Sequence, residues 1–262
     1  MAAAEGAWSD LRTRLLSAAA LLLVAGFSVG LGGVWFTLLV LVAVALMVWE
    51  LVPLFGTAQM PVRTGLAALG AGSVAYLAFS QTEMAFLLLL TAPVLLAVRA
   101  GRDRMAGFCY ALAVLAAGAG LIFLRQEGLA AVLWLIAVVV ASDVMGYFAG
   151  RMLGGPKFWP AVSPKKTWSG TIAGWIGAAL VGAGFVIWAD AGWGLVLLSA
   201  VTALAGQIGD IAESALKRRA GVKDSSNLIP GHGGVLDRFD AILGAALVWL
   251  VIAGTPLVGV LP

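Results

Sequence analysis

The chain has 262 residues and a net charge of +3 at pH 7, and 62% of its residues are hydrophobic while 11% are charged. A soluble globular domain carries about 25% charged residues, so this composition excludes an ordinary soluble protein. The single cysteine excludes an intrachain disulfide and a thiolate metal cluster. The positive charge suits contact with anionic lipid headgroups and gives no indication of nucleic-acid binding.

Apolar runs that approach or reach the length needed to cross a bilayer, about 17–25 residues, recur along the whole chain. We identify nine such spans, of which the fourth is short. They are Leu15–Gly30, Val34–Trp49, Thr64–Phe79, Met84–Val98, Met105–Leu124, Leu129–Gly150, Thr167–Trp188, Gly194–Ala215 and Phe239–Leu257. The sequence therefore predicts an all-α, polytopic integral membrane protein with about nine transmembrane helices.

Lysines and arginines are distributed unevenly between the two sides of these spans. With a cytoplasmic N-terminus, fifteen of the sixteen fall on the cytoplasmic side and only Arg125 falls on the opposite side. Loops that stay in the cytoplasm carry an excess of Lys and Arg. The split therefore predicts a cytoplasmic N-terminus, a C-terminus on the outer side, and basic loops that face the cytoplasm.

The two halves of the chain differ in character. Residues 1–128 form five spans joined by short loops, in which Glu50 and Glu83 look interfacial. Residues 129–262 carry the acids within spans, two basic loops and a Gly/Pro-rich turn. Because there is no internal repeat and no low-complexity linker, we expect residues 1–262 to form a single integral membrane domain.

Glycines recur at helical spacing within two of the predicted spans. The pairs Gly146/Gly150 and Gly170/Gly174 each place small residues on one helix face. Such pairs let helix backbones approach closely in a membrane, so we expect them to serve helix packing.

Acidic residues lie within the membrane core or at its inner edge in three of the spans. Asp143 lies in the sixth span, Asp210 in the eighth, and Asp237 and Asp240 open the ninth. Ionisable residues inside a membrane are costly and usually functional. Given the predicted topology, all of these acids approach the cytoplasmic side.

The eighth span carries its polar residues in one stripe. Asp210, Glu213, Ser214 and Lys217 stand at i, i+3, i+4 and i+7, which places them on one helix face. Carboxylates together with substrate phosphates are what Mg²⁺ binds in proteins, so the acids are candidate metal ligands. The alternative is that Asp237–Arg238 and Asp210–Lys217 are structural ion pairs.

Basic residues next to these acids suit phosphate binding. Lys165 and Lys166 stand where the seventh span begins, and a helix N-terminus favours anions. The next cytoplasmic loop carries Lys217, Arg218, Arg219 and Lys223, and its PGHGG turn at Pro230–Gly234 lets backbone N–H groups approach a ligand. We expect His232 in this turn to contact the ligand. For arginines elsewhere in the chain, the tendency of basic residues to stay on the cytoplasmic side is a sufficient explanation of their charge.

Between Ser214 and Asp240 the sequence resembles the signature of phosphatidate cytidylyltransferases, the CDP-diacylglycerol synthases. The matching residues are Ser214, Lys217-Arg218, Lys223-Asp224, Pro230, His232-Gly233-Gly234, Asp237-Arg238 and Asp240. Two further blocks are similar to the same family: Ser142-Asp143 with Gly146-Tyr147-Phe148 and Gly150-Arg151, and the block from Ser163 to Trp168. The chain departs from the family at Ser169, where Glu is common.

The resemblance implies that CTP and phosphatidate react to give CDP-diacylglycerol and pyrophosphate at the cytoplasmic face of the inner membrane. It implies a homodimer, and a metal ion, Mg²⁺, held by Asp210 and Asp237 beside Asp240, with a monovalent cation such as K⁺ nearby. The catalytic residues implied are Asp210, Asp237, Lys217, Lys223 and Asp224. The substrate-binding residues implied are Lys165, Lys166, Ser214, Arg218, His232, Gly233, Gly234, Arg238 and Asp143.

Two other classes of protein and a related enzyme remain as alternatives. A transporter or channel also uses intramembrane acids, but it is expected to carry them along a path open to both sides and often has two related halves. A structural membrane protein leaves the acids unexplained. The closest alternative is another lipid-directed nucleotidyl- or phosphotransferase that acts on a polyprenyl or ether lipid.

The predicted topology can be tested with reporter fusions. Fusions after Leu124 and Asp190 are expected to report the outer side, and fusions after Arg104 and Arg219 the cytoplasm, because of the fifteen-to-one distribution of basic residues. A C-terminus that reports the cytoplasm would contradict the predicted number of spans.

Overall fold

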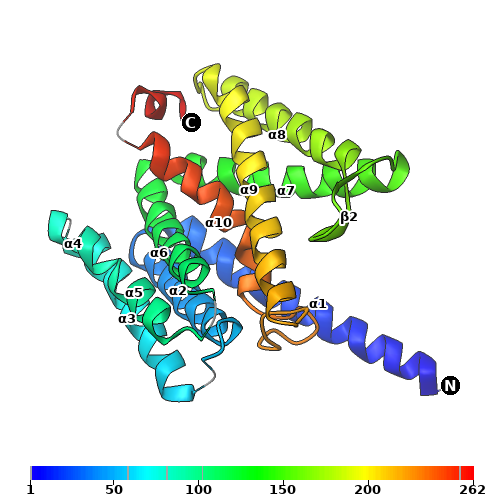
Figure 1. Cartoon of the computed structure of the whole chain (residues 1–262). Helices are drawn as coiled ribbons and strands as arrows, with labels where there is room; N and C mark the ends of the chain where they lie inside the picture. Colours follow the sequence, from blue (N-terminus) through cyan, green and yellow to red (C-terminus); the bar gives the residue numbers. More distant parts are fainter. Residues whose placement is uncertain (1, 58, 81, 102, 254) are drawn as a thin grey trace. The chain divides into compact units, whose positions relative to one another are not determined.

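The computed structural model describes residues 2–57, 59–80, 82–101, 103–253 and 255–262, and most of them are helical (Figure 1). The elements in chain order are α1 (Ala2–Leu31), α2 (Gly33–Leu54), α3 (Met60–Ser80), α4 (Glu83–Leu88), α5 (Thr91–Arg99), α6 (Arg104–Glu127), α7 (Leu129–Met152), β1 (Lys157–Trp159), β2 (Ser163–Thr167), α8 (Trp168–Trp188), α9 (Gly194–Arg219), α10 (Leu236–Ile252) and the 3₁₀ helix η1 (Pro256–Val260).

Seven helices within the described residues are long and apolar enough to cross a membrane: α1, α2, α3, α6, α7, α8 and α9. Each coincides with one of the nine predicted spans. Leu22 and Leu23 of α1 are each 74% exposed, which suits a helix that lies against lipid. The protein is therefore a multi-pass α-helical membrane protein, while the number of spans and the orientation stay predictions.

The fourth predicted span is broken in the structure. In place of one helix over Met84–Val98, the chain forms α4 and α5 with a turn at Leu89 and Leu90. Pro93 explains the break, because its ring clashes with the carbonyl group four residues earlier and is tolerated only in the first turn of a helix. The Thr91 hydroxyl donates to the Leu88 carbonyl at 2.6 Å and closes the turn. The ninth predicted span corresponds to α10, which has 17 residues.

The chain divides into two compact units. The first comprises Met1–Leu115 with Ala220–Arg238, and the second comprises Ala116–Arg219 with Phe239–Pro262. In the first unit α2 packs against α3, and Leu51, Val52 and Val74 are fully buried. The single integral domain that the sequence predicts stays a prediction.

In the second unit α7, α8 and α9 lie side by side (Figure 1). The predicted close approach at the glycine pairs is confirmed. A Cβ atom at Gly170 would lie 2.5 Å from the Gly146 carbonyl oxygen, and one at Gly150 would lie 3.0 Å from Thr167 Oγ1. A Cβ atom at Gly174 would likewise lie 2.7 Å from Gln207 Nε2. The glycines therefore bring three backbones together where polar side chains meet.

A short antiparallel hairpin connects α7 to α8 and was not predicted from the sequence. Its strands pair Lys157 with Thr167 and Trp159 with Ser163. Thr167 ends the hairpin and caps α8, because its hydroxyl accepts a hydrogen bond from the Gly170 N–H at 3.3 Å. The hairpin thus holds Lys165 and Lys166 directly before the N-terminus of α8.

Gly170→Ala is expected to destabilise the α7–α8 contact, because the added Cβ atom forces the two backbones apart. Overpacking of this kind costs about 1–3 kcal/mol. The unfolding midpoint of the detergent-solubilised protein measures the effect. The control is Gly184→Ala on the same helix, where a Cβ atom meets nothing within 4 Å. Equal midpoints for the two variants would contradict the packing role.

Candidate active site

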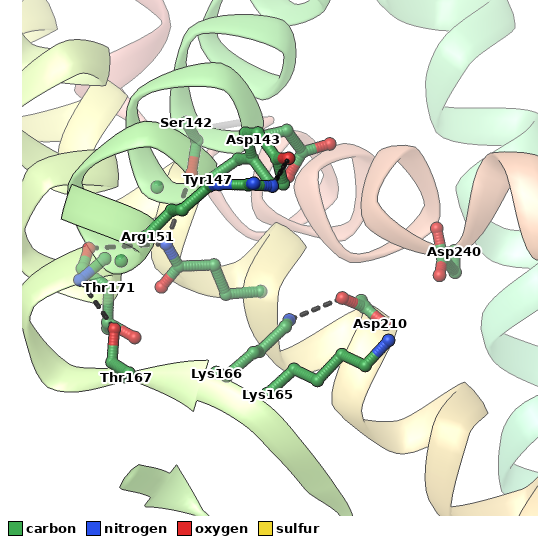
Figure 2. Close-up of a pocket in the computed structure, with 14 residues that line it drawn as sticks. Ser142, Asp143, Tyr147, Arg151, Lys165, Lys166, Thr167, Thr171, Asp210 and Asp240 are labelled. Atoms are coloured by element: carbon green, nitrogen blue, oxygen red, sulfur yellow. Dashed lines mark hydrogen bonds and ion pairs between the residues drawn. The ribbon is translucent and has the colours of Figure 1, made fainter. Parts of the chain in front are cut away.

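A cavity of about 740 Å³ lies within the second unit (Figure 2). Its walls come from α7, β2, α8, α9 and α10. They are formed by Ser142, Asp143, Gly146, Tyr147, Gly150, Arg151, Lys165, Lys166, Thr167, Gly170, Thr171, Gln207, Asp210 and Asp240. Three of these side chains are aspartates and three are lysine or arginine, so the cavity offers ligands for a cation and for an anion together.

The lysines of β2 and the arginine of α7 supply the positive charge. Figure 2 shows Lys165 and Lys166 extending toward Asp210. Lys166 Nζ forms an ion pair with Asp210 Oδ2 at 2.5 Å. Arg151 Nη1 donates to the Tyr147 hydroxyl at 2.9 Å, one helical turn earlier on α7. These cations lie where phosphate groups can replace their present partners.

The three aspartates of the cavity come from three different helices. The carboxylates of Asp143 and Asp240 each interact electrostatically with that of Asp210. Ser214 donates to Asp210 Oδ1 at 3.3 Å, and the Ala241 N–H donates to Asp240 Oδ1 at 2.7 Å. Carboxylates that repel one another are stabilised by a cation close to them. The ammonium group of Lys166 is such a cation, since it pairs with Asp210.

The acids of the cavity suit a metal ion that is bound by protein and substrate phosphate together better than one that is bound by protein side chains alone. In the described part of the chain, no group of three or more His, Cys, Asp or Glu side chains is close enough to hold a metal ion. Mg²⁺ usually takes only one or two carboxylates, together with substrate phosphates and water. Asp210 and Asp240 are oxygen donors of that kind, so the residues present fit a magnesium ion that arrives with a phosphorylated substrate.

The first turn of α8 also faces the cavity. Thr167, Gly170 and Thr171 form part of its wall, at the end of the helix where backbone N–H groups lack partners within the helix. Such a helix N-terminus favours anions. It thus adds to the field of Lys165 and Lys166, as the sequence predicted.

The predicted polar stripe of α9 is confirmed, but its members have different environments. Lys217 Nζ forms an ion pair with Glu213 Oε2 at 2.9 Å, and the Glu213 side chain is fully buried. Lys217 is not among the residues that line the cavity. The structural ion pairs of α9 therefore join Lys217 to Glu213 and Asp210 to Lys166, in place of the Asp210–Lys217 pair considered from the sequence. Arg218 is exposed at the end of the helix.

The remaining predicted residues belong to the first unit, in the loop between α9 and α10 and in the first turn of α10. They are Lys223, Asp224, His232, Gly233, Gly234, Asp237 and Arg238. Asp237 Oδ2 accepts from the Ser225 N–H at 2.9 Å, the Ser225 hydroxyl at 2.9 Å and the Gly234 N–H at 2.8 Å. These bonds join the first turn of α10 to the loop before it, and the role of Asp237 as a metal ligand stays a prediction.

The PGHGG turn is held by a backbone hydrogen bond and by the side chain of Arg238. Ile229 N–H donates to the Gly233 carbonyl at 2.8 Å, and Arg238 Nε donates to the His232 carbonyl at 2.9 Å. Gly233 has φ of 83°, a conformation that favours glycine. The His232 ring is half-buried. Contact of this turn with substrate stays a prediction.

Two polar residues that the sequence analysis did not select hold these regions in place. Gln207 Nε2 donates to Ser142 Oγ at 3.2 Å and its Oε1 accepts from Trp175 Nε1 at 3.0 Å, so it joins α9 to α7 and α8. Its position three residues before Asp210 continues the polar stripe, which could have identified it.

The other is Glu50, which the sequence suggests is interfacial but which is fully buried. No local pattern in the sequence indicates its partners.

The chain is similar to known proteins along most of its length. The model of the cytidylyltransferase family matches residues 12–254. A phosphatidate cytidylyltransferase of Brucella abortus (strain 2308) is 37% identical over 257 residues, which cover 91% of each chain. A protein of the same name from Brucella melitensis shows the same identity and coverage. One from Staphylococcus saprophyticus is 40% identical over 144 residues, 53% of this chain and 55% of the relative.

Proposed function

The chain belongs to the cytidylyltransferase family, and we propose that it transfers the cytidylyl group of CTP to phosphatidate, giving CDP-diacylglycerol and pyrophosphate. The observation that supports this reaction most directly is the cavity of the second unit, in which acidic and basic side chains face one another. We place the reaction at the cytoplasmic face of the inner membrane, where lipid enters from the bilayer and nucleotide from water. A homodimer and a monovalent cation such as K⁺ complete the proposal.

The attacking group needs little activation by the protein. The second pKa of a phosphate monoester is about 6, so phosphatidate is largely a dianion at neutral pH and already a nucleophile. The main obstacle is the repulsion between this dianion and the triphosphate. Lys165, Lys166 and Arg151 reduce that repulsion, and the N-terminus of α8 orients the phosphate groups.

We propose that Mg²⁺ binds with the nucleotide at Asp210 and Asp240. When bound, the ion neutralises charge on the phosphates and stabilises the departing pyrophosphate. Lys166 has a matching role, because its ammonium group pairs with Asp210 in the structure and can exchange that partner for a phosphate oxygen. The exchange leaves the Asp210 carboxylate available to a cation.

The reaction is tested by product analysis with purified protein. With α-labelled CTP and phosphatidate, the label is expected in a lipid that co-migrates with CDP-diacylglycerol, with release of unlabelled pyrophosphate. Diacylglycerol, which lacks the attacking phosphate, is the matched negative control. Label that enters no lipid with phosphatidate, including the case in which a parallel reaction with a polyprenyl phosphate does give labelled lipid, would contradict the proposal.

Asp210→Asn is expected to lower CTP-dependent activity by about a hundredfold, because it keeps the size of the side chain but removes a charge that the cation needs. The matched control is Asp190→Asn in the α8–α9 loop. Asp190 is exposed and has φ of 53°, which asparagine also adopts. Activity of both variants is measured against Mg²⁺ concentration. Near-parental activity of Asp210→Asn at low Mg²⁺ would rule out the metal assignment.

A further inference from the structure

Glu50 is a fully buried carboxylate near the C-terminal end of α2, in the first unit. A charged group that leaves water is strongly unfavourable unless hydrogen bonds replace its hydration. Its place at the end of an apolar helix supplies no such donors locally. The side chain therefore has to be stabilised by groups from elsewhere in the chain.

Four donors from one distant segment meet the two carboxylate oxygens of Glu50. Oε1 accepts from the Ser226 hydroxyl at 2.6 Å and the Val235 N–H at 3.0 Å. Oε2 accepts from the Leu236 N–H at 2.7 Å and lies 3.2 Å from the Ser225 hydroxyl. These donors follow Glu50 by 175 to 186 residues. One side chain thus bonds both ends of the segment from Ser225 to Leu236.

Two of these donors are backbone N–H groups at the start of α10. The first N–H groups of a helix have no acceptor within the helix, and a negative charge beside them is favourable. Val235 and Leu236 stand at this position. Glu50 therefore completes the N-terminus of α10, which carries Asp237 in its first turn.

Ser225 links the Glu50 carboxylate to Asp237. Its hydroxyl lies 3.2 Å from Glu50 Oε2 and 2.9 Å from Asp237 Oδ2, so its single proton can be donated to either carboxylate. Gly234 fits closely between the same groups, since a Cβ atom there would lie 2.7 Å from both Glu50 oxygens. Glu50, Ser225, Gly234 and Asp237 therefore form one packed polar cluster, and the absence of a side chain at Gly234 is a condition for it.

We infer that Glu50 is a positioning residue that fixes the conformation of the segment from Ser225 to Arg238, which comprises the end of the α9–α10 loop and the first turn of α10, for the transfer reaction. This segment contains His232, Asp237 and Arg238, and the Arg238 side chain donates to the His232 carbonyl. The inference rests on the proposed function for its link to catalysis. The anchoring of the loop itself is a property of the first unit and can be measured without any substrate.

The test compares hydrogen–deuterium exchange of the solubilised parent protein with that of Glu50→Gln, Glu50→Asp and Ser226→Ala. Glu50→Gln removes the charge that the four donors face. Exchange in peptides from residues 222–238 is expected to rise by about tenfold, with little change in α3 and α8. Glu50→Asp keeps the charge on a shorter side chain and is expected to recover part of the protection. Ser226→Ala removes one donor and is expected to have the same effect as Glu50→Gln to a smaller extent.

The control is Ser73→Ala, a buried serine of the same unit whose hydroxyl donates to the Gly70 carbonyl of its own helix. It is expected to leave loop exchange unchanged. Unchanged loop exchange in both Glu50→Gln and Ser226→Ala would overturn the inference. So would an equal rise in α3 and in the loop, because Glu50 would then support the fold generally.

Activity measured on the same variants connects the loop to the reaction. For Glu50→Gln, kcat/KM is expected to fall by about tenfold or more, with partial recovery in Glu50→Asp and parental values in Ser73→Ala. Parental kcat/KM in Glu50→Gln despite faster loop exchange would overturn the catalytic part of the inference. A parent protein that makes no CDP-diacylglycerol would instead refute the proposed function, and the exchange data would still decide whether Glu50 anchors the loop.

Discussion

A carboxylate that is buried in an apolar protein needs hydrogen-bond donors or a cation to replace its hydration. Much of this structure follows from that constraint. Glu50 is met by two backbone N–H groups and two serine hydroxyls. Glu213 is met by Lys217, and the partly exposed Asp210 is met by Lys166. The first arrangement fixes a loop, the second stabilises α9, and the third keeps charged groups ready for a ligand. The difference in exposure separates structural acids from candidate functional ones.

Features that depend on local spacing could be predicted from the sequence. Hydropathy located the helices, and a period of three to four residues placed Asp210, Ser214 and Lys217 on one face of α9. The helical spacing within the pairs Gly146/Gly150 and Gly170/Gly174 indicated close packing, which the structure confirms. In each case the information lies within a few turns of one helix, where geometry alone determines which side chains are neighbours.

Features that depend on tertiary contacts could not be predicted. Nothing near Glu50 in the sequence indicates donors 175 residues later, and its place at the end of an apolar run is typical of an interfacial residue. The hairpin that carries Lys165 could not be predicted, because its two short strands show no alternation of hydrophobic and polar residues. The break between α4 and α5 is a different case, because its cause, Pro93, is local and hydropathy alone does not register its steric effect. The sequence places Gln207 in the polar stripe of α9, but its role in joining α9 to α7 and α8 follows only from its partners, Ser142 and Trp175.

The proposed reaction requires the cavity of the second unit to bind the phosphates of CTP. An acyl-phosphate derivative of CTP tests this directly, because it acylates lysines that lie beside the nucleotide phosphates. Mass spectrometry is expected to find the modification on Lys165 or Lys166, and excess CTP is expected to prevent it. Lys157 is the internal control, since it is exposed on the same hairpin but does not line the cavity. Modification of Lys157 alone, or modification of Lys165 and Lys166 that CTP does not reduce, would contradict the account.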